Sequence, residues 1–257
     1  MTALKIQSLD VMLEDKPLLQ DISLEIPAGS VCVLMGPNGA GKSSLVKTIV
    51  GHPNFSVAAG DIQFFGESLL EKTPDERALL GISFVFQSPR EIDGLVLKGI
   101  LYDVYKKHVL HKYGMTLDEA RRDKDRRKEL SPVKFQKRLT ELFEKFSLHP
   151  SLLDRDLHKG FSGGEKKKVE LIFSLLMKPK FLILDELDSG LDTDALKTCA
   201  EMVVFMKEEY NTAVLCITHS TRLISLLGTN EVFVLQDGKI VERGDESLAV
   251  KKEKQGF

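Results

Sequence analysis

Residues 36–43 read GPNGAGKS and match the phosphate-loop pattern G-x-x-x-x-G-K-S/T. The glycines allow backbone N–H groups to turn inward around an anion, and a helix that begins near Lys42 adds its positive dipole end. Lys42 can reach terminal phosphates, and Ser43 can ligate Mg²⁺. A continuous apolar run at 30–35 and apolar residues at helical spacing within 42–50 predict the order strand, loop, helix. This context favours a working phosphate loop over an incidental glycine turn.

Residues 181–186 read FLILDE, an apolar strand that ends in two carboxylates. At the carboxyl end of a parallel strand, such groups face the crevice where ligands bind. We expect Asp185 to hold Mg²⁺, usually through water, and Glu186 to polarise an attacking water. Buried strands often end in Asp, so this motif is weak alone. It becomes strong because a phosphate loop precedes it.

The flanking segments predict an α/β chain. Residues 3–26 alternate apolar with polar, as half-buried antiparallel strands do. Residues 213–217 form a second buried strand, and residues 194–209 are expected to be helical. Residues 233–241, with Asp237-Gly238 at the turn, predict a hairpin.

The middle of the chain differs in charge. Residues 106–145 contain 13 Lys and Arg against 7 Asp and Glu, so the rest of the chain is net acidic. A capping box at Thr116 and Glu119, an N-cap at Ser131 before Pro132, and an apolar stripe from Phe135 to Phe146 predict helices. We interpret the run 121–129 as a solvated helix face or loop, with a docking patch as the alternative.

Composition excludes several classes of protein. The chain has 257 residues, 42% hydrophobic and 29% charged, with a net charge of −2, and a generic nucleic-acid-binding domain would be more basic. No apolar stretch reaches 18 residues, and the start has no signal-peptide core, so neither a membrane span nor a signal peptide is expected. Cys32 and Cys216 lie in apolar runs, which indicates packed thiols. Three cysteines without a CxxC pair indicate a reducing compartment, and we expect a cytoplasmic protein.

Residues 161–165, FSGGE, resemble the signature motif of ABC ATPases. The other motifs of that superfamily follow in its order: Gln87 resembles the Q-loop glutamine, residues 188–192 the D-loop, and His219 the H-loop histidine. The resemblance implies an ABC ATPase fold, with a RecA-like P-loop core, an antiparallel β subdomain and an inserted helical lobe. It places the core at about 1–88 and 160–257 and the lobe at about 89–159, within one ABC ATPase domain.

The resemblance also implies the site residues of an ATPase that uses ATP and Mg²⁺. The catalytic set is Lys42, Glu186 and His219, and the metal ligands are Ser43, Gln87 and Asp185. A second copy would present its signature, Ser162, Gly163, Gly164 and Glu165, across a transient ATP-dependent homodimer, with Ser189 and Asp192 in the D-loop. ATP-binding residues are Gly36, Pro37, Asn38, Gly39, Ala40, Gly41, Lys42, Ser43, Ser44 and Gln87.

A narrower likeness covers nearly the whole chain. Residues 160–168 (GFSGGEKKK) and 185–197 (DELDSGLDTDALK) look like the SufC family, the ABC-type ATPases of SUF iron–sulfur cluster assembly. Residues 86–94, 241–245 and 254–257 resemble that family too. The likeness implies SufB- and SufD-like scaffold partners, no nucleic acid and no membrane insertion. The alternative is the nucleotide-binding subunit of an ABC membrane transporter, because the same residues catalyse hydrolysis in both.

The sequence also argues against two further classes of P-loop protein. An intact set of Lys42, Asp185, Glu186 and His219 argues against a P-loop module that binds without hydrolysing. A chromosome-maintenance ABC protein needs long coiled coils, for which this chain has no room.

Two departures from the family pattern carry expectations. Residues 1–54 contain no Phe, Tyr or Trp, so adenine contact would come from apolar residues such as Val11 or Met12, with poor base selectivity. Leu187 stands where the family has a small polar residue, which is expected to affect packing beside the D-loop.

The partner surface is expected within 87–102. This segment has more apolar side chains than a loop beside Gln87 needs for its own packing, which favours a surface for a partner protein. The alternative is that these side chains pack inside the helical lobe. They are Ile92, Leu95, Val96, Leu97, Ile100 and Leu101.

Overall fold

The computed structural model describes all residues, 1–257, and divides into two compact units. Unit 1 comprises Met1–Gln87, Lys178–Ser189 and Val203–Phe257, and unit 2 comprises Ser88–Met177 and Gly190–Met202. The sequence predicts the helical lobe at about 89–159. Unit 2 extends beyond that to residue 177 because helix α7 (Gly163–Met177) packs against helix α3 (Leu97–Lys112).

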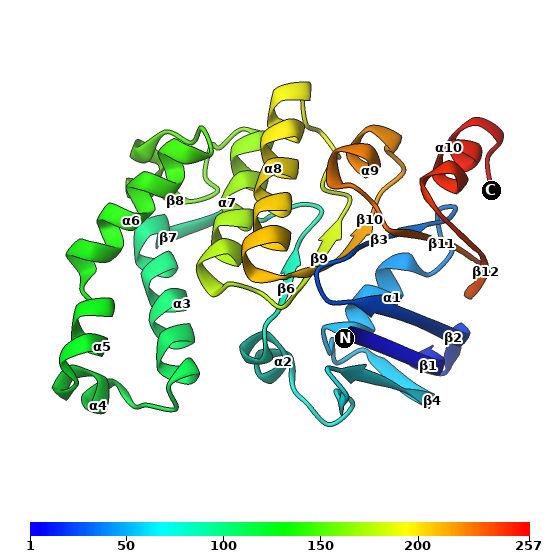
Figure 1. Cartoon of the computed structure of the whole chain (residues 1–257), viewed down its shortest axis with the longest axis horizontal. Coiled ribbons are helices and arrows are strands. Elements are labelled where there is room, and N and C mark those ends of the chain that lie inside the picture. The colour runs from blue at the N-terminus through cyan, green and yellow to red at the C-terminus, as the bar shows by residue number, and fades with distance from the viewer. The chain divides into compact units, whose positions relative to one another are not determined.

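Unit 1 is built on a six-stranded sheet in the order β12-β11-β3-β10-β9-β6 (Figure 1). All neighbours are parallel except the hairpin β11–β12, which confirms the predicted turn at Asp237-Gly238. Every residue of β3 and β10 is buried, as the apolar runs predict. The strands are β3 (Val31–Met35), β6 (Ile82–Val85), β9 (Phe181–Asp185), β10 (Ala213–Ile217), β11 (Glu231–Gln236) and β12 (Lys239–Gly244).

A second, four-stranded antiparallel sheet of unit 1 has the order β2-β1-β4-β5. Its strands are β1 (Thr2–Leu13), β2 (Lys16–Pro27), β4 (Phe55–Phe64) and β5 (Glu67–Ser68). One hydrophobic core joins the apolar faces of both sheets and the buried side of helix α1 (Lys42–Ile49). Short helices complete the unit: α2 (Pro74–Leu80), α9 (Thr221–Leu227) and α10 (Glu246–Gln255).

Unit 2 is mostly helical, and its local signals are confirmed. The capping box of Thr116 and Glu119 opens α4, and Pro132 occupies the first turn of α6. Helix α5 buries no residue, so the charged run is solvent-exposed over residues 124–129. The remaining elements are α3, α4 (Leu117–Arg122), α5 (Lys124–Glu129), α6 (Pro132–Lys145), the 3-10 helix η1 (Pro150–Asp154), the strands β7 (Ile92–Val96) and β8 (Asp156–Leu157), and α7. Helix α8 (Thr193–Tyr210) runs from unit 2 into unit 1.

The six apolar residues after Gln87 divide into three groups, of which Leu95 and Ile100 are half-buried. Leu97 and Leu101 are fully buried, so the expectation that they offer partner surface is wrong, since they pack inside unit 2. Ile92 and Val96 are 46% and 38% exposed and remain available.

All three cysteines are buried free thiols, which confirms the expectation for Cys32 and Cys216. Burial raises the pKa of Cys32 to about 11 and that of Cys199 to about 12, and it raises the pKa of Cys216 further. They are packing residues with little thiolate character. None of the helices combines the length and the hydropathy that a bilayer-spanning segment requires.

Candidate nucleotide site

The phosphate loop connects β3 to α1, and two of its glycines are required by space as well as by conformation. Gly36 has φ 152°, and a Cβ there would lie 2.0 Å from the Leu235 carbonyl oxygen. Gly41, the N-cap of α1, has φ 107°, and its Cβ would lie 2.6 Å from Leu19 Cδ2. The loop therefore turns through backbone that larger residues cannot adopt. The first N–H groups of α1 have no partner within the helix and can bind an anion.

Lys42 is held over this loop. Its side chain is buried, and its ammonium donates to the carbonyl oxygens of Gly36 at 2.6 Å and Pro37 at 2.9 Å. Burial lowers the pKa of Lys42, while the charges of Glu186 and Asp185 act in the opposite direction. The ammonium is thus fixed within electrostatic reach of both carboxylates.

The predicted metal ligands are oxygen donors of the kind that Mg²⁺ prefers. Asp185 ends β9, Gln87 follows the neighbouring strand β6, and Ser43 lies in the first turn of α1 with an exposed side chain. No group of three His, Cys, Asp or Glu residues in this chain could hold a metal by itself. A magnesium ion at a nucleotide site needs only one or two carboxylates, because phosphates and water supply the remaining ligands. The residues present therefore fit Mg²⁺ bound together with a nucleotide.

Glu186 leaves the sheet by a sharp turn. Its φ is 48°, in the left-handed region, and its N–H donates to the carbonyl oxygen of Ile217 on β10 at 3.0 Å. Its carboxylate accepts a hydrogen bond from the side-chain amide of Gln87. The parallel pairing of β6 with β9 brings these two side chains together from positions 99 residues apart in the chain.

His219 follows β10 at the same sheet edge and is partly buried. Burial is the main cause that lowers its pKa, and the charge of Lys42 lowers it further. The carboxylates of Glu186 and Asp188 oppose this shift. The imidazole is therefore favoured in its neutral form, which can both donate and accept a hydrogen bond.

Two contacts around His219 were not predicted from the sequence. Thr218 donates from its hydroxyl to Asp188 at 2.8 Å and accepts from the N–H of Ser220 at 2.9 Å, which links the D-loop to the histidine loop. A polar residue directly after the buried strand β10 was the available signal. The ring of Phe257 lies edge-on to the imidazole, with centroids 5.5 Å apart.

Of the two predicted adenine contacts, one is buried and the other is partly exposed. Val11 has no exposed surface and belongs to the core, so it cannot contact a base, whereas Met12 is partly exposed on the same strand. The alternation of β1 turns Val11 inward, which makes that expectation wrong. Leu187 is fully buried, in line with a packing role.

The signature motif opens helix α7 of unit 2. The Ser162 hydroxyl accepts from the Glu165 N–H at 3.2 Å, and the Glu165 carboxylate accepts from the Ser162 N–H at 2.7 Å. This reciprocal capping box explains why a carboxylate suits the last position of the motif. A Cβ on Gly164 would lie 2.9 Å from that of Ala195, so the helix start packs closely on α8.

A hollow of about 520 Å³ lies beside this helix start. It is lined by the four signature residues and by Asp192, whose carboxylate accepts from the Ala195 N–H at 2.8 Å. Ser189, the other D-loop residue, belongs to unit 1, where its N–H donates to the Glu186 carbonyl oxygen at 3.1 Å.

Polar contacts fasten the segment after Gln87 to the signature loop within unit 2. Lys166 pairs with Glu91 at 2.8 Å, and Lys159 pairs with Asp93 at 2.7 Å. His158 is buried, with Nδ1 3.1 Å from the Arg90 carbonyl oxygen and Nε2 3.2 Å from the carboxylate of Glu170. Strands β7 and β8 pair in the same place. The sequence showed no pattern that links these residues.

Five predicted residues of unit 1 thus converge at the carboxyl edge of one sheet: Lys42, Gln87, Asp185, Glu186 and His219. Ser43, Ser44 and the loop that contains Asn38, Gly39 and Ala40 lie at that edge as well, whereas the signature belongs to unit 2. A phosphate loop facing a carboxylate-ended strand at this position defines a P-loop nucleotide-binding protein.

The chain belongs to the ABC transporter family, whose pattern matches residues 19–189. A second family pattern matches residues 159–225 only, that of the "AAA domain, putative AbiEii toxin, Type IV TA system". The chain is 39% identical over its whole length to a probable ATP-dependent transporter of Synechocystis, slr0075, and covers 94% of that protein. It is equally similar to the probable ATP-dependent transporter ycf16 of Pyropia yezoensis, covering 96%, and 37% identical to vegetative protein 296 of Bacillus subtilis, covering 92%.

Solved structures confirm the predicted ABC ATPase fold. A nucleotide-free ATP-binding cassette from an ABC transporter superposes with a TM-score of 0.75 at 22% identity, over 99% of this chain and 95% of that one. The ATP-binding cassette MJ0796, a dimer in a post-hydrolysis state bound to ADP and Pi, gives 0.75 at 19% identity, over 95% and 98%. The chain is therefore an ATP-binding cassette of a family that hydrolyses ATP.

Proposed function

We propose that this chain binds ATP with Mg²⁺ and hydrolyses it within a dimer of two copies. The observation that carries the proposal is the convergence of the Lys42 ammonium, the paired carboxylates and His219 at one sheet edge, with pKa shifts that show mutual electrostatic reach. Phosphoryl transfer needs positioning and charge stabilisation more than covalent chemistry, and this set supplies both.

Each residue then has a defined part. Lys42 and the N–H groups of the loop bind the terminal phosphates, and Glu186 orients the attacking water and accepts its proton. His219, neutral, donates a hydrogen bond to the γ-phosphate. Mg²⁺, held by Ser43, Gln87 and Asp185, would offset the negative charge of the phosphates.

The second copy would complete the anion site. Its Ser162 and Gly164, at the positive end of α7, would add hydroxyl and N–H donors to the γ-phosphate. Closing the dimer would thereby depend on the nucleotide, and hydrolysis would release it. The dimeric post-hydrolysis state of MJ0796 supports this proposal by analogy of fold.

We propose two candidate kinds of partner protein that would use the closing and opening of the dimer. The names of the relatives slr0075 and ycf16 favour a transporter, in which the chain would be the ATP-binding subunit of a membrane complex. The SufC-like stretches at 160–168 and 185–197 favour the second candidate, a SUF-type assembly on a scaffold of SufB- and SufD-like proteins in the cytoplasm. In both cases the partner would contact the exposed residues Ile92 and Val96. They lie in the segment that is linked to the signature loop by the ion pair of Lys166 with Glu91.

Affinity purification from the native cells, followed by mass spectrometry of membrane and supernatant fractions, distinguishes the two. Recovery with integral membrane permeases supports the transporter, and recovery with supernatant scaffold proteins supports the assembly role. The Ile92→Asp variant should lose the partner, whereas Val241→Asp, on the 50% exposed Val241 of β12, should keep it. ATP-dependent phosphate release tests hydrolysis itself, and its absence from the purified complex would refute the proposed activity.

A further inference from the structure

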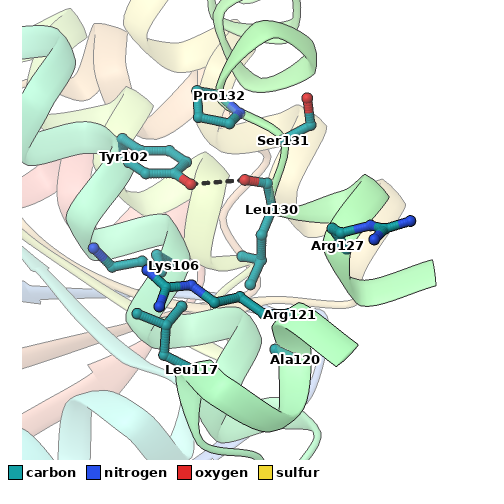
Figure 2. A pocket seen from close by; sticks show the side chains of 9 residues that line it. All are labelled: Tyr102, Lys106, Leu117, Ala120, Arg121, Arg127, Leu130, Ser131 and Pro132. Atoms are coloured by element: carbon teal, nitrogen blue, oxygen red, sulfur yellow. Dashed lines mark hydrogen bonds between the residues drawn. The ribbon is translucent and has the colours of Figure 1, made fainter. Parts of the chain in front are cut away.

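A pocket of about 440 Å³ lies in the charged part of unit 2, between α3, the α4–α5 segment and the start of α6 (Figure 2). Its floor is apolar: Ala120 and Leu130 are buried there, and Leu117 adds a partly exposed side chain. None of the residues of the nucleotide site or of the signature motif lines this pocket.

The lining of the pocket carries charge of one sign. Three of its residues are basic, Lys106, Arg121 and Arg127, and none is acidic. In Figure 2 the Arg121 side chain extends from α4 toward the side of the pocket where Lys106 lies, whereas Arg127 points away. Two cations at the rim of one hollow repel each other, and an anion bound there would remove that repulsion.

The partners that these two cations now have are weak competitors. Lys106 pairs with Asp103 at 2.6 Å and Arg121 with Asp118 at 3.4 Å, each within its own helix. The two aspartate side chains are 66% and 78% exposed, and ion pairs this exposed contribute little to stability. Exchange of these partners for an incoming carboxylate would therefore cost little.

The shape of the pocket is held by a specific contact. The Tyr102 hydroxyl donates to the Leu130 carbonyl oxygen at 2.7 Å, so the link between α5 and α6 is tied to α3 (Figure 2). The Lys106 ammonium lies 5.4 Å from the centroid of the same tyrosine ring. A pocket that exists before binding avoids the entropic cost of forming it.

The pocket combines an apolar floor with cations at its rim. A free inorganic anion would not use the floor of Leu117 and Leu130. A peptide with an apolar side chain between carboxylates would use the floor and the rim cations together.

We propose that this pocket docks an acidic peptide segment of a partner protein, with one apolar side chain on the floor and flanking carboxylates on Lys106 and Arg121. This inference does not rest on the proposed function, because it needs neither nucleotide nor a second copy.

The test uses the full chain and a short fluorescein-labelled peptide with a central leucine flanked by glutamates. Fluorescence anisotropy at low salt should give a Kd on the order of 10 μM, a strength ordinary for a short peptide motif. The double variant Lys106→Gln with Arg121→Gln should weaken binding by about tenfold or more. The control Lys137→Gln, on an 82% exposed lysine of α6 outside the pocket, should change it less than about twofold.

Further probes decide the chemistry of the ligand. A peptide with glutamines in place of glutamates, or with a central alanine, should bind at least about fivefold more weakly. The proposal would be overturned if either altered peptide bound as tightly as the original peptide, or if the double variant bound the original peptide as tightly as the wild type. Absence of any binding to the wild type would overturn it as well. Displacement by equimolar inorganic phosphate would identify a small-anion site instead, and preferred binding of a single-stranded RNA would identify a nucleic-acid site. ATP hydrolysis and thermal unfolding should be unchanged in both variants, which excludes misfolding as the cause.

Discussion

The side-chain amide of Gln87 donates a hydrogen bond to the carboxylate of Glu186. These residues follow two neighbouring parallel strands, β6 and β9, and Glu186 has a left-handed backbone conformation. The contact couples the proposed base to the residue that precedes unit 2. A shift of Gln87 would therefore change the position of the carboxylate that orients water.

Glu186→Gln should lower ATP turnover by about 10²–10⁴-fold, because it keeps the shape of the side chain and removes the charge that polarises water. The contacts of Lys42, Ser43 and Asp185 should survive, so ATP should persist and the closed dimer should accumulate. Size-exclusion chromatography with ATP and Mg²⁺ should show a dimer of this variant, and ADP should not produce it. Near-normal hydrolysis would assign the base to another residue, with His219 the next candidate.

Lys42→Ala should abolish useful ATP binding. The ammonium is buried over the loop, and loss of a charged partner to a phosphate costs about 2–5 kcal/mol. Isothermal titration of ATP measures the effect. Lys47→Ala, on the exposed face of the same helix, is the matched control and should bind ATP normally. Wild-type affinity of the Lys42 variant would contradict the assignment.

The nucleotide site should discriminate poorly between adenine and guanine. Residues 1–54 contain no aromatic side chain, and stacking of a base on an aromatic ring is worth about 1–3 kcal/mol. We expect kcat/KM for ATP and GTP to agree within about tenfold in parallel phosphate-release assays. A preference for ATP of about a thousandfold would show that an aromatic from another part of the chain closes over the base.

The free energy of unfolding should depend on pH through His219. Burial and Lys42 lower its pKa below the ordinary value of 6.5, so the unfolded chain binds the proton more readily than the folded chain does. The stabilisation is present above pH 6.5 and is lost as the pH falls from there through the lower folded pKa. We expect the free energy of unfolding, measured by urea denaturation at several pH values between about 5 and 7, to change less steeply with pH for His219→Gln than for the wild type. Identical slopes would contradict this role.

Arg77 should be a stability residue that catalysis does not use. Its buried guanidinium donates to four backbone carbonyl oxygens, among them those of Thr48 and Ile49 at the end of α1. Lysine cannot reproduce that fork, and Arg77→Lys should lower the free energy of unfolding by about 2–4 kcal/mol. Urea denaturation followed by circular dichroism measures the change. Arg122→Lys, on an exposed arginine of α4, should have an effect below about 0.5 kcal/mol.

Local sequence patterns were sufficient to predict the phosphate loop, the strand that ends in Asp185 and the helix caps of unit 2. These features depend on local rules: glycine alone tolerates the backbone of residues 36 and 41, and a capping box closes within four residues. The order of the motifs then indicated the family, which the match over residues 19–189 confirms.

Only the tertiary structure decided which side chains meet and which are accessible. Gln87 meets Glu186 because β6 and β9 pair, and the register of β1 buries Val11. The packing of α3 against α7 buries Leu97 while Ile92 stays exposed. The pocket with Lys106 and Arg121 likewise needs three segments to meet. Burial and contact between distant residues depend on strand pairing and helix packing, which no local pattern in one sequence encodes.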